Sequence, residues 1–122
     1  MTYSIAALDA ATGELGVAVQ TRWLAAGSGV PWVRPGVGAI ATQSFTDARY
    51  GYAGLDLLAR GQTPERALAE LLAADRDPGV RQVGMVSASG AVAAHTGAEC
   101  VAFAGHLTGD GVTVHANMME RA

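Results

Sequence analysis

The order of the segments along the chain limits the fold more than any other feature. β-type runs at residues 3–9, 15–21 and 38–43 precede two helix-type segments, and four further β-type runs follow them. Strands joined by short glycine-containing turns are typical of antiparallel sheets, and helices grouped together do not match the alternation of a parallel α/β fold. We therefore predict an α+β fold with two helices layered on antiparallel sheet, forming one domain over residues 1–122.

The β-type runs differ in how clearly they are bounded. Residues 3–9 and 15–21 flank a turn that contains Gly13, which predicts a β-hairpin. Residues 24–37 are rich in glycine and proline and are predicted to form a loop. The runs after the helices lie at 81–88, 91–95, 101–107 and 112–117. They predict an antiparallel meander.

The last of these runs has two unlike faces. Val112, Val114 and Ala116 alternate with Thr113, His115 and Asn117. Because side chains alternate across a strand, one face is apolar and the other presents three polar groups together. We expect this polar face to be a surface for a ligand or partner.

The two helix-type segments carry start signals and apolar stripes. Asp47 is placed to cap the first helix, which is predicted to end near Gly61. Its predicted apolar stripe consists of Ala48, Tyr52, Leu55 and Ala59. The second helix has Thr63 as its cap and Pro64 at its first position. Its apolar face consists of Leu68, Leu71 and Leu72.

The composition limits the cellular compartment and the classes of partner that we expect for this chain. Cys100 is the single cysteine, so no intrachain disulfide forms and a cytoplasmic protein is expected. The net charge of −3 and the scattered arginines argue against nucleic acid, and no apolar run is long enough to cross a membrane. With 50% hydrophobic and only 16% charged residues, some apolar surface is expected to meet another chain, which predicts a homo-oligomer.

Seven short segments together resemble the bacterial proteins grouped as "domain of unknown function 1028". The segments are residues 2–6, 14–20, 30–32, 36–43, 94–97, 104–106 and 117–118. The resemblance implies a place among the N-terminal nucleophile (Ntn) hydrolases, which are four-layer αββα sandwiches. Members of that family are longer than this chain. The sandwich is therefore expected to be incomplete here, and the chain to be a fragment, a processed chain or a short form that needs a partner.

The resemblance implies that Thr2 is a catalytic nucleophile. In Ntn hydrolases the first residue of the mature chain attacks, and its own α-amine is the base; Thr2 takes this place if Met1 is removed. An α-amine titrates near neutrality and is suited to that task. Ser4 shares a strand face with Thr2 and is a candidate helper hydroxyl. The alternative is that both are ordinary strand residues.

Other residues near strand ends are candidates to complete such a site. The chain has no lysine, so Arg22 or Arg34 is the candidate for the cation beside the nucleophile. Gln20, Thr42 and Gln43 are candidates to orient a carbonyl or to donate to an oxyanion. The alternative for Gln43 is that it fills a hydrogen bond in a buried strand. The reaction would be hydrolysis of a C–N amide bond in a small molecule or peptide, without a cofactor.

The remaining polar residues give weaker signals. The intervals between His95, Cys100, His106 and His115 fit no tight metal-binding motif, so no metal site is predicted. His95 and Thr96 precede a turn glycine and are candidates to line a cleft. Trp32 is a candidate to contact an apolar substrate or partner, with core packing as its alternative.

A non-catalytic role on the same scaffold is the competing hypothesis. The chain would then bind a small ligand or a partner through the aromatic loop and the polar face of the last run. Fold alone does not decide between these functions.

Overall fold

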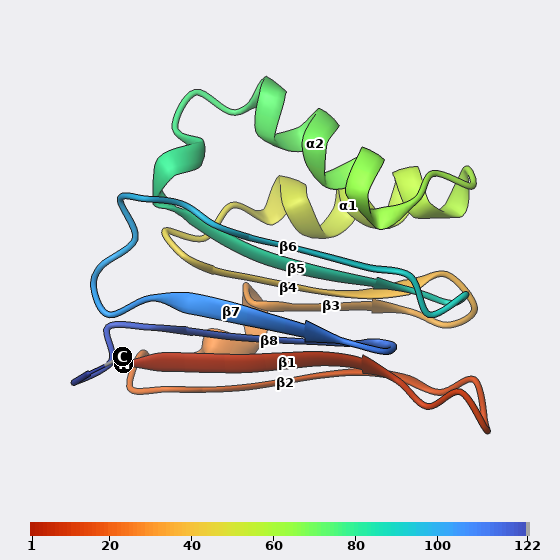
Figure 1. The fold of residues 1–122 in the computed structure, drawn as a ribbon, viewed down its shortest axis with the longest axis horizontal. Helices are drawn as coiled ribbons and strands as arrows, with labels where there is room; N and C mark the ends of the chain where they lie inside the picture. Colours follow the sequence, from red (N-terminus) through yellow and green to blue (C-terminus); the bar gives the residue numbers. More distant parts are fainter. Residues whose placement is uncertain (122) are drawn as a thin grey trace.

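Two four-stranded antiparallel sheets form the framework of the computed structural model, which describes residues 1–121 (Figure 1). The first sheet has the order β2 (Leu15–Thr21), β1 (Thr2–Leu8), β8 (Val112–Asn117) and β7 (Gly105–Gly109). The second has the order β3 (Pro31–Arg34), β4 (Gly38–Ser44), β5 (Arg81–Ser87) and β6 (Val92–Thr96). The predicted α+β class is confirmed.

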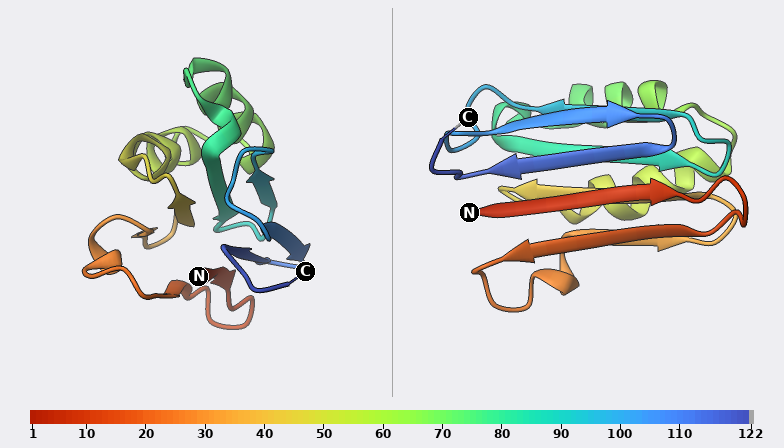
Figure 2. Two further views of the ribbon diagram at one scale, coloured as in Figure 1. Left: turned by 90° about the vertical axis from the view of Figure 1, so that its left-hand side faces the viewer. Right: turned by 60° about the horizontal axis from the view of Figure 1, so that its bottom comes forward.

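Both helices lie on the same side of the molecule. α1 (Ala48–Ala59) and α2 (Pro64–Ala74) cover the β3-β4-β5-β6 sheet, which we call the covered sheet (Figures 1 and 2). The β2-β1-β8-β7 sheet packs on the opposite side of the covered sheet, and within residues 1–121 no helix lies on its outer face; we call it the open sheet. Neither α1 nor α2 has the length and hydrophobicity of a transmembrane span.

The helix starts follow the predicted capping chemistry. The Asp47 carboxylate accepts from the Arg49 N–H, and the Thr63 hydroxyl accepts from the Arg66 N–H. The predicted stripe of α1 is mostly wrong: Leu55 is buried, but Ala48, Tyr52 and Ala59 are exposed. The buried face is formed instead by Tyr50, Gly51, Gly54, Leu55, Leu57 and Leu58. Small residues let α1 approach the sheet: a Cβ on Gly51 would overlap the ring of Trp32.

The main hydrophobic core lies between the helices and the covered sheet. Its central side chains are Ile40, Tyr50, Leu55, Leu58, Leu68, Val83 and Met85. Trp32, Leu71 and Leu72 pack against them. A smaller core between the two sheets is formed around Ala6, Ala39 and Val86, with Leu8 and Val17 beside it. The helices are therefore held by the larger of the two cores.

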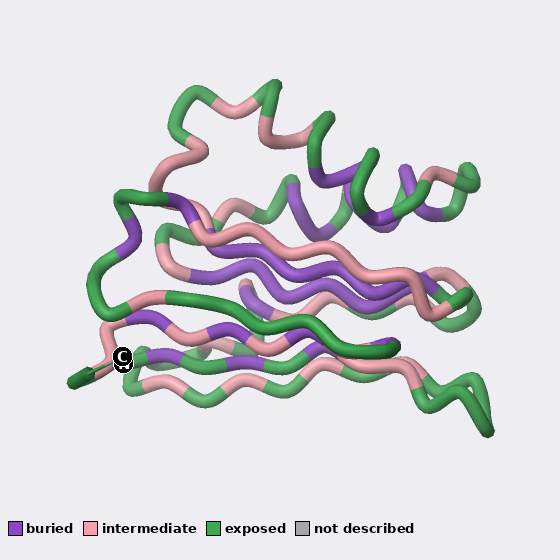
Figure 3. The backbone as a smooth tube through the Cα atoms, viewed as in Figure 1, coloured by how far each residue is buried: buried purple, intermediate pink, exposed green. Residues whose placement is uncertain are grey.

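The open sheet has its polar face inward. Along β1, Thr2 and Ser4 are buried, whereas Tyr3 is 43% and Ile5 39% exposed (Figure 3). β8 repeats the pattern, since its polar residues are buried and its apolar residues only partly so. The predicted alternation of β8 is confirmed, but the polar face faces the other sheet and is not the binding surface that was expected.

Three predictions of strand arrangement are corrected. Residues 31–34, predicted as loop, form β3 because they pair with β4 at the sheet edge, where Pro31 is tolerated. The second half is not one meander: the chain leaves the covered sheet after β6 and enters the open sheet at β7. The predicted strand at 101–107 begins only at Gly105, because the preceding residues make this crossing.

Candidate functional site

Thr2 lies at the head of β1, where the first strand of the chain pairs with the last. It pairs with Thr21 of β2 on one side and with Asn117 of β8 on the other. Its side chain is only 5% exposed, and its Oγ1 lies 2.9 Å from the Oγ1 of Thr21. The Thr2 hydroxyl is therefore held in one position by a neighbouring strand.

A cavity of about 260 Å³ lies beside Thr2, and we call it the Thr2 cavity. Its walls come from the ends of β1, β2 and β4 and from the loop before β3. They consist of Thr2, Thr21, Trp23, Ala25, Ala26, Ser28, Gly29, Val30, Gln43, Ser44, Thr46 and Met118. None of these residues is charged. The cavity thus combines apolar surface with neutral hydrogen-bonding groups.

Three residues of this cavity have a left-handed backbone. Ala25 has φ 60°, Ser44 has φ 68° and Met118 has φ 53°, and none of them is a glycine. This conformation is uncommon for residues with side chains and is found disproportionately at functional sites. Ser44 directly follows Gln43 and Met118 directly follows Asn117, and the side chains of Gln43 and Asn117 face the space between the sheets. The backbone strain at Ser44 and Met118 therefore lies where β4 and β8 turn away from the cavity.

Three buried amide side chains connect the sheets next to this cavity, and we call them the amide cluster. Gln82 of β5 is the centre: its Nε2 donates to the backbone oxygens of Gly105 at 3.0 Å and Ala116 at 2.9 Å. Its Oε1 accepts from Gln43 Nε2 at 2.8 Å and from Asn117 Nδ2 at 3.0 Å. Because a backbone carbonyl can only accept, the orientation of all three amides is fixed.

This orientation leaves two buried carbonyl oxygens unused. Within residues 1–121, the Oε1 of Gln43 and the Oδ1 of Asn117 have no hydrogen-bond partner. Buried acceptors are normally paired. Gln43 belongs both to the amide cluster and to the wall of the Thr2 cavity. Its Nε2, which the sequence had made a candidate oxyanion donor, is already bonded to Gln82, and its Oε1 is buried without a partner within residues 1–121.

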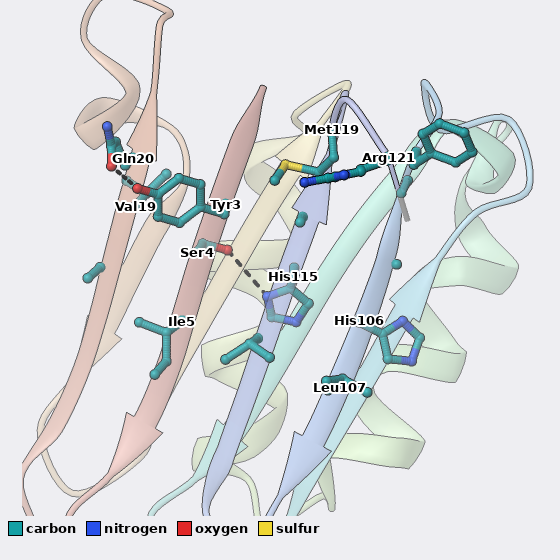
Figure 4. Close-up of a pocket in the computed structure, with 16 residues that line it drawn as sticks. Tyr3, Ser4, Ile5, Val19, Gln20, His106, Leu107, His115, Met119 and Arg121 are labelled. Atoms are coloured by element: carbon teal, nitrogen blue, oxygen red, sulfur yellow. Dashed lines mark hydrogen bonds between the residues drawn. The ribbon is translucent and has the colours of Figure 1, made fainter.

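Ser4 lies one step further along β1 and contacts a histidine. Its Oγ is 3.3 Å from Nδ1 of His115, the residue opposite it on β8 (Figure 4). Burial lowers the pKa of His115 to about 4, and the charge of His106 contributes to the shift. His115 is therefore neutral near pH 7. A Cβ on Gly84 of the covered sheet would overlap its ring, so only glycine fits there.

His95 and Thr96 point to opposite sides of β6. Thr96 Oγ1 accepts from Gln82 Nε2 at 3.0 Å and lies 2.8 Å from His106 Nδ1, so it belongs to the polar layer between the sheets. His95 Nε2 instead bonds the backbone oxygen of Pro78 at 2.9 Å. The two residues therefore do not line one cleft.

The other predicted site residues lie away from the Thr2 cavity. Gln20 is on the outer face of the open sheet, where its side-chain oxygen accepts from the Tyr3 hydroxyl. Arg22 is exposed and is not part of the cavity wall, although both its neighbours are. Trp32 donates to the backbone oxygen of Gly29 at 2.9 Å and packs against the helical core, as its alternative reading expected.

Thr42 and Arg34 are also separate from this site. Thr42 is fully buried in β4 between Ala41 and Gln43, and its Oγ1 has no partner within residues 1–121. Arg34 bonds Asp56 of α1 at 2.9 Å on the surface of the molecule. No three His, Cys, Asp or Glu side chains in the described part of the chain come together as a metal site.

Sequence reasoning missed two members of the amide cluster. Gln82 stands in an otherwise apolar run of β5, and a polar residue in such a run is the signal that could have identified it. Asn117 and His115 were noticed as polar but were assigned to an exposed surface. Of the residues that the sequence predicted, Thr2 and Gln43 share the wall of the cavity, and Gln43 and Thr96 both bond Gln82. Ser4 contacts His115 instead.

A larger groove of about 740 Å³ lies on the outer face of the open sheet (Figure 4). Tyr3, Ile5, Leu107 and Met119 are among its lining residues, with Arg121 at one end. The apolar side chains that the open sheet turns outward thus form a concave surface.

Comparison with known proteins identifies a family and a similar solved structure. The model of "Family of unknown function (DUF1028)" matches residues 2–122. Among solved structures, the chain is similar to protein SPO2555 from Silicibacter pomeroyi, whose crystal structure is described with the same family. The two align with a TM-score of 0.93 and 30% sequence identity, over 98% of this chain and 55% of SPO2555. The chain therefore spans about half the length of that protein. No curated protein matches it.

Proposed function

The chain belongs to the DUF1028 family, a family of unknown function, and from that premise we propose that it is an Ntn-type amidohydrolase with Thr2 as its nucleophile. The observation that carries the proposal is the position of Thr2: a buried hydroxyl at the head of β1 that lines a cavity between strand ends. Two stacked antiparallel sheets with helices on one side also suit an Ntn-hydrolase-like sandwich. The free, buried Cys100 is compatible with a cytoplasmic setting.

The proposed reaction begins once Met1 has been removed. The α-amine of Thr2 takes the proton from Oγ1, and Oγ1 attacks the carbonyl carbon of an amide. The tetrahedral intermediate collapses, the C–N bond breaks, and the departing amine takes the proton. Water then hydrolyses the ester formed on Thr2. Thr21 positions the attacking oxygen through the 2.9 Å contact between the two hydroxyls.

The test compares three variants of one residue type. Thr2→Ala is expected to lower the turnover of amide substrates by at least about a thousandfold, because it removes the nucleophile. Thr2→Ser is expected to retain part of the activity. Thr108→Ala, a matched change on the exposed strand β7, is expected to leave turnover unchanged. Full activity of Thr2→Ala, or an intact mass that retains Met1 in the active protein, would contradict the proposal.

A second proposal concerns the outer face of the open sheet. We propose that two copies of the chain associate through this face, because Ile5 and Leu107 are exposed there beside an apolar groove. In such a dimer each copy would cover the open sheet of its partner, as α1 and α2 cover the covered sheet within one chain. Such a face suits a non-catalytic partner-binding role as well as an enzyme.

Sedimentation velocity tests this association. The wild-type chain is expected to sediment as a dimer and Leu107→Asp as a monomer, since Leu107 is 73% exposed and its replacement should not disturb the fold. Thr108→Asp adds the same charge at the neighbouring position, which faces the other way, and serves as the control. A wild-type monomer at high concentration would contradict the proposal.

A further inference from the structure

The side chain of Thr21 contacts more than the Thr2 hydroxyl. Its Oγ1 donates to the backbone oxygen of Met1 at 3.3 Å, beside the peptide bond that joins Met1 to Thr2. We infer that Thr21 is a catalytic residue, whose hydroxyl donates to the carbonyl oxygen of the substrate once Met1 has been removed. The inference rests on the proposed function, because it assigns a further role within the same site.

The direction of each hydrogen bond at Thr21 follows from the number of hydrogens available. A threonine hydroxyl has one hydrogen to donate and two lone pairs that accept. The Trp23 N–H donates to Thr21 Oγ1 at 3.3 Å, and the Met1 carbonyl can only accept. If Thr21 donates to Met1, the Thr2 hydroxyl, 2.9 Å away, donates to Thr21 and each of these groups is paired. The opposite direction would leave the hydrogen of the buried Thr2 hydroxyl without an acceptor within residues 1–121.

The Met1 carbonyl marks a place beside Thr2 at which an amide oxygen accepts from Thr21. Once Met1 has left, the hydrogen of Thr21 loses this acceptor. A substrate carbonyl that Thr2 attacks presents the same kind of oxygen at the same place. The Trp23 N–H strengthens the donor, because an N–H that bonds the oxygen of a hydroxyl polarises its O–H.

Thr21 lies where a ligand reaches it. It is half-buried at the end of β2 and lines the Thr2 cavity together with Thr2. The amide nitrogen of Gln43, in the same wall, is already bonded to Gln82. No charged side chain lines the cavity, so negative charge that develops on a bound carbonyl must be stabilised by neutral donors. The Thr21 hydroxyl is such a donor, next to the attacking oxygen.

The contact acts on the step in which this charge develops. As Thr2 Oγ1 bonds the carbonyl carbon, the C=O double bond becomes a single bond and its oxygen gains a negative charge, while the hydrogen of Oγ1 moves to the α-amine. Thr21 keeps its own hydrogen and donates it to that oxygen. Hydrogen bonds to a charged oxygen are stronger than those to a neutral one, so the contact stabilises the intermediate more than the bound substrate.

The experiment uses methylboronic acid, which reports on this step without turnover. Its boron bonds Thr2 Oγ1 and becomes tetrahedral and negatively charged, with a boron-bound oxygen in the place of the charged carbonyl oxygen. The probe is titrated into the chain without Met1, and boron NMR measures the tetrahedral form. Thr21→Val has a similar shape but no hydroxyl, and is expected to weaken binding by about tenfold or more, the loss of one hydrogen bond to a charged oxygen. Thr21→Ser keeps the donor and is expected to bind within about threefold of the wild type.

Two controls separate donation from a structural role of Thr21. Thr108→Val makes the same replacement on the exposed strand β7 and is expected to bind the probe as the wild type does. Nitrogen NMR of the Thr2 α-amine, recorded without the probe, is expected to give the same titration curve in Thr21→Val and Thr21→Ser. A curve altered in Thr21→Val alone would mean that Thr2 has moved, and would overturn the inference. Thr21→Ala, which also lacks a donor, serves if Thr21→Val does not fold.

The same design separates this inference from the proposed function. A tetrahedral boron signal that appears in the wild type and is lost in Thr2→Ala supports Thr2 as the nucleophile, whatever Thr21 does. If Thr21→Val then binds the probe as tightly as the wild type, the proposed function stands and the role of Thr21 is rejected. A wild-type chain without Met1 that gives no tetrahedral boron signal would overturn both.

Discussion

The covered sheet and the open sheet have the same number of strands and the same antiparallel pairing, yet they distribute polarity in opposite ways. The covered sheet buries apolar side chains against two helices. The open sheet turns polar side chains toward the interior and leaves apolar ones on its outer face. Local rules of burial are most often broken at functional sites. We therefore expect the open sheet to be the site of function and the covered sheet to support it.

The two sheets also differ in what stabilises them. In the covered sheet the stabilising term is apolar burial, which is roughly proportional to area and has no direction. Between the sheets, near the Thr2 cavity, it is a set of directional hydrogen bonds centred on Gln82. Directional bonds fix positions more sharply than apolar contacts do. The following predictions test this difference, beginning with the largest effect.

The largest expected difference is in the free energy of unfolding when one isoleucine of each sheet is replaced by alanine. Ile40 is fully buried under the helices, so Ile40→Ala is expected to lower the free energy of unfolding by about 3–4 kcal/mol. Ile5 is 39% exposed on the open sheet of a single chain, so Ile5→Ala is expected to cost about 1 kcal/mol or less at concentrations at which the proposed dimer is dissociated. Urea denaturation of both variants at such concentrations measures the difference. Equal losses in the dissociated chain would show that Ile5 is not exposed as described.

The next effect is a pH dependence that originates in the open sheet. The pKa of His115 is about 4 in the folded chain and near 6.5 when unfolded, so only the unfolded state gains this proton between those values. The free energy of unfolding is therefore expected to fall by up to about 3 kcal/mol as the pH decreases from 6.5 to 4, and to gain nothing from this group above 6.5.

His115→Gln should remove that part of the pH dependence. His95→Gln, the matched change in the covered sheet, should retain it. Denaturation curves recorded at several pH values for the three chains provide the measurement. A wild-type chain whose stability is constant between pH 6.5 and 4 would show that His115 is not buried as described.

The third effect probes the contact between the sheets. Gly84→Ala would place a methyl group against the His115 ring and is expected to cost about 2 kcal/mol by overpacking. Gly16→Ala, on a strand of the open sheet with nothing within 4 Å of the added Cβ, is expected to change stability by a few tenths of a kcal/mol at most. Thermal unfolding compares them. If the two variants were equally stable, the sheets would not pack as closely as the structure has them.

The smallest effect concerns the outer face alone. Tyr3→Phe removes the hydroxyl that donates to Gln20, and because that pair is exposed the change is expected to cost about 0.5 kcal/mol. Gln20→Leu should be similarly mild. Urea denaturation at concentrations at which the proposed dimer is dissociated measures the loss. A loss several times larger under those conditions would mean that the pair is not exposed in the single chain.

Much of the fold could be predicted from local signals. The caps Asp47 and Thr63, and the ends of β2 and β8, follow from residue types whose preferences are strong. β3 was missed because Pro31 and the surrounding glycines look like a loop, and only its pairing with β4 makes it a strand. The crossing between β6 and β7 depends on which sheet each strand joins. Local sequence contains no information on that choice.

The candidate site was less predictable, for a related reason. Two-residue periodicity correctly placed Thr2 and Ser4 on one face of β1. Periodicity does not say which face is inward, and the usual rule of apolar residues inside gives the wrong answer for β8. Gln20 was grouped with Gln43 because both lie near strand ends, although the two strands belong to different sheets. Residues from four strands meet only when the sheets are stacked.

The pairing of Thr2 with Asn117 has a consequence for how the chain matures. A ribosome releases β1 first, but the strand that lies beside it, β8, is made more than a hundred residues later. During that interval one edge of the β1–β2 hairpin has no neighbour, and contacts between such distant segments form slowly. The hairpin must therefore stay free of wrong partners throughout synthesis, and the space around Thr2 takes its shape only once Asn117 has been added.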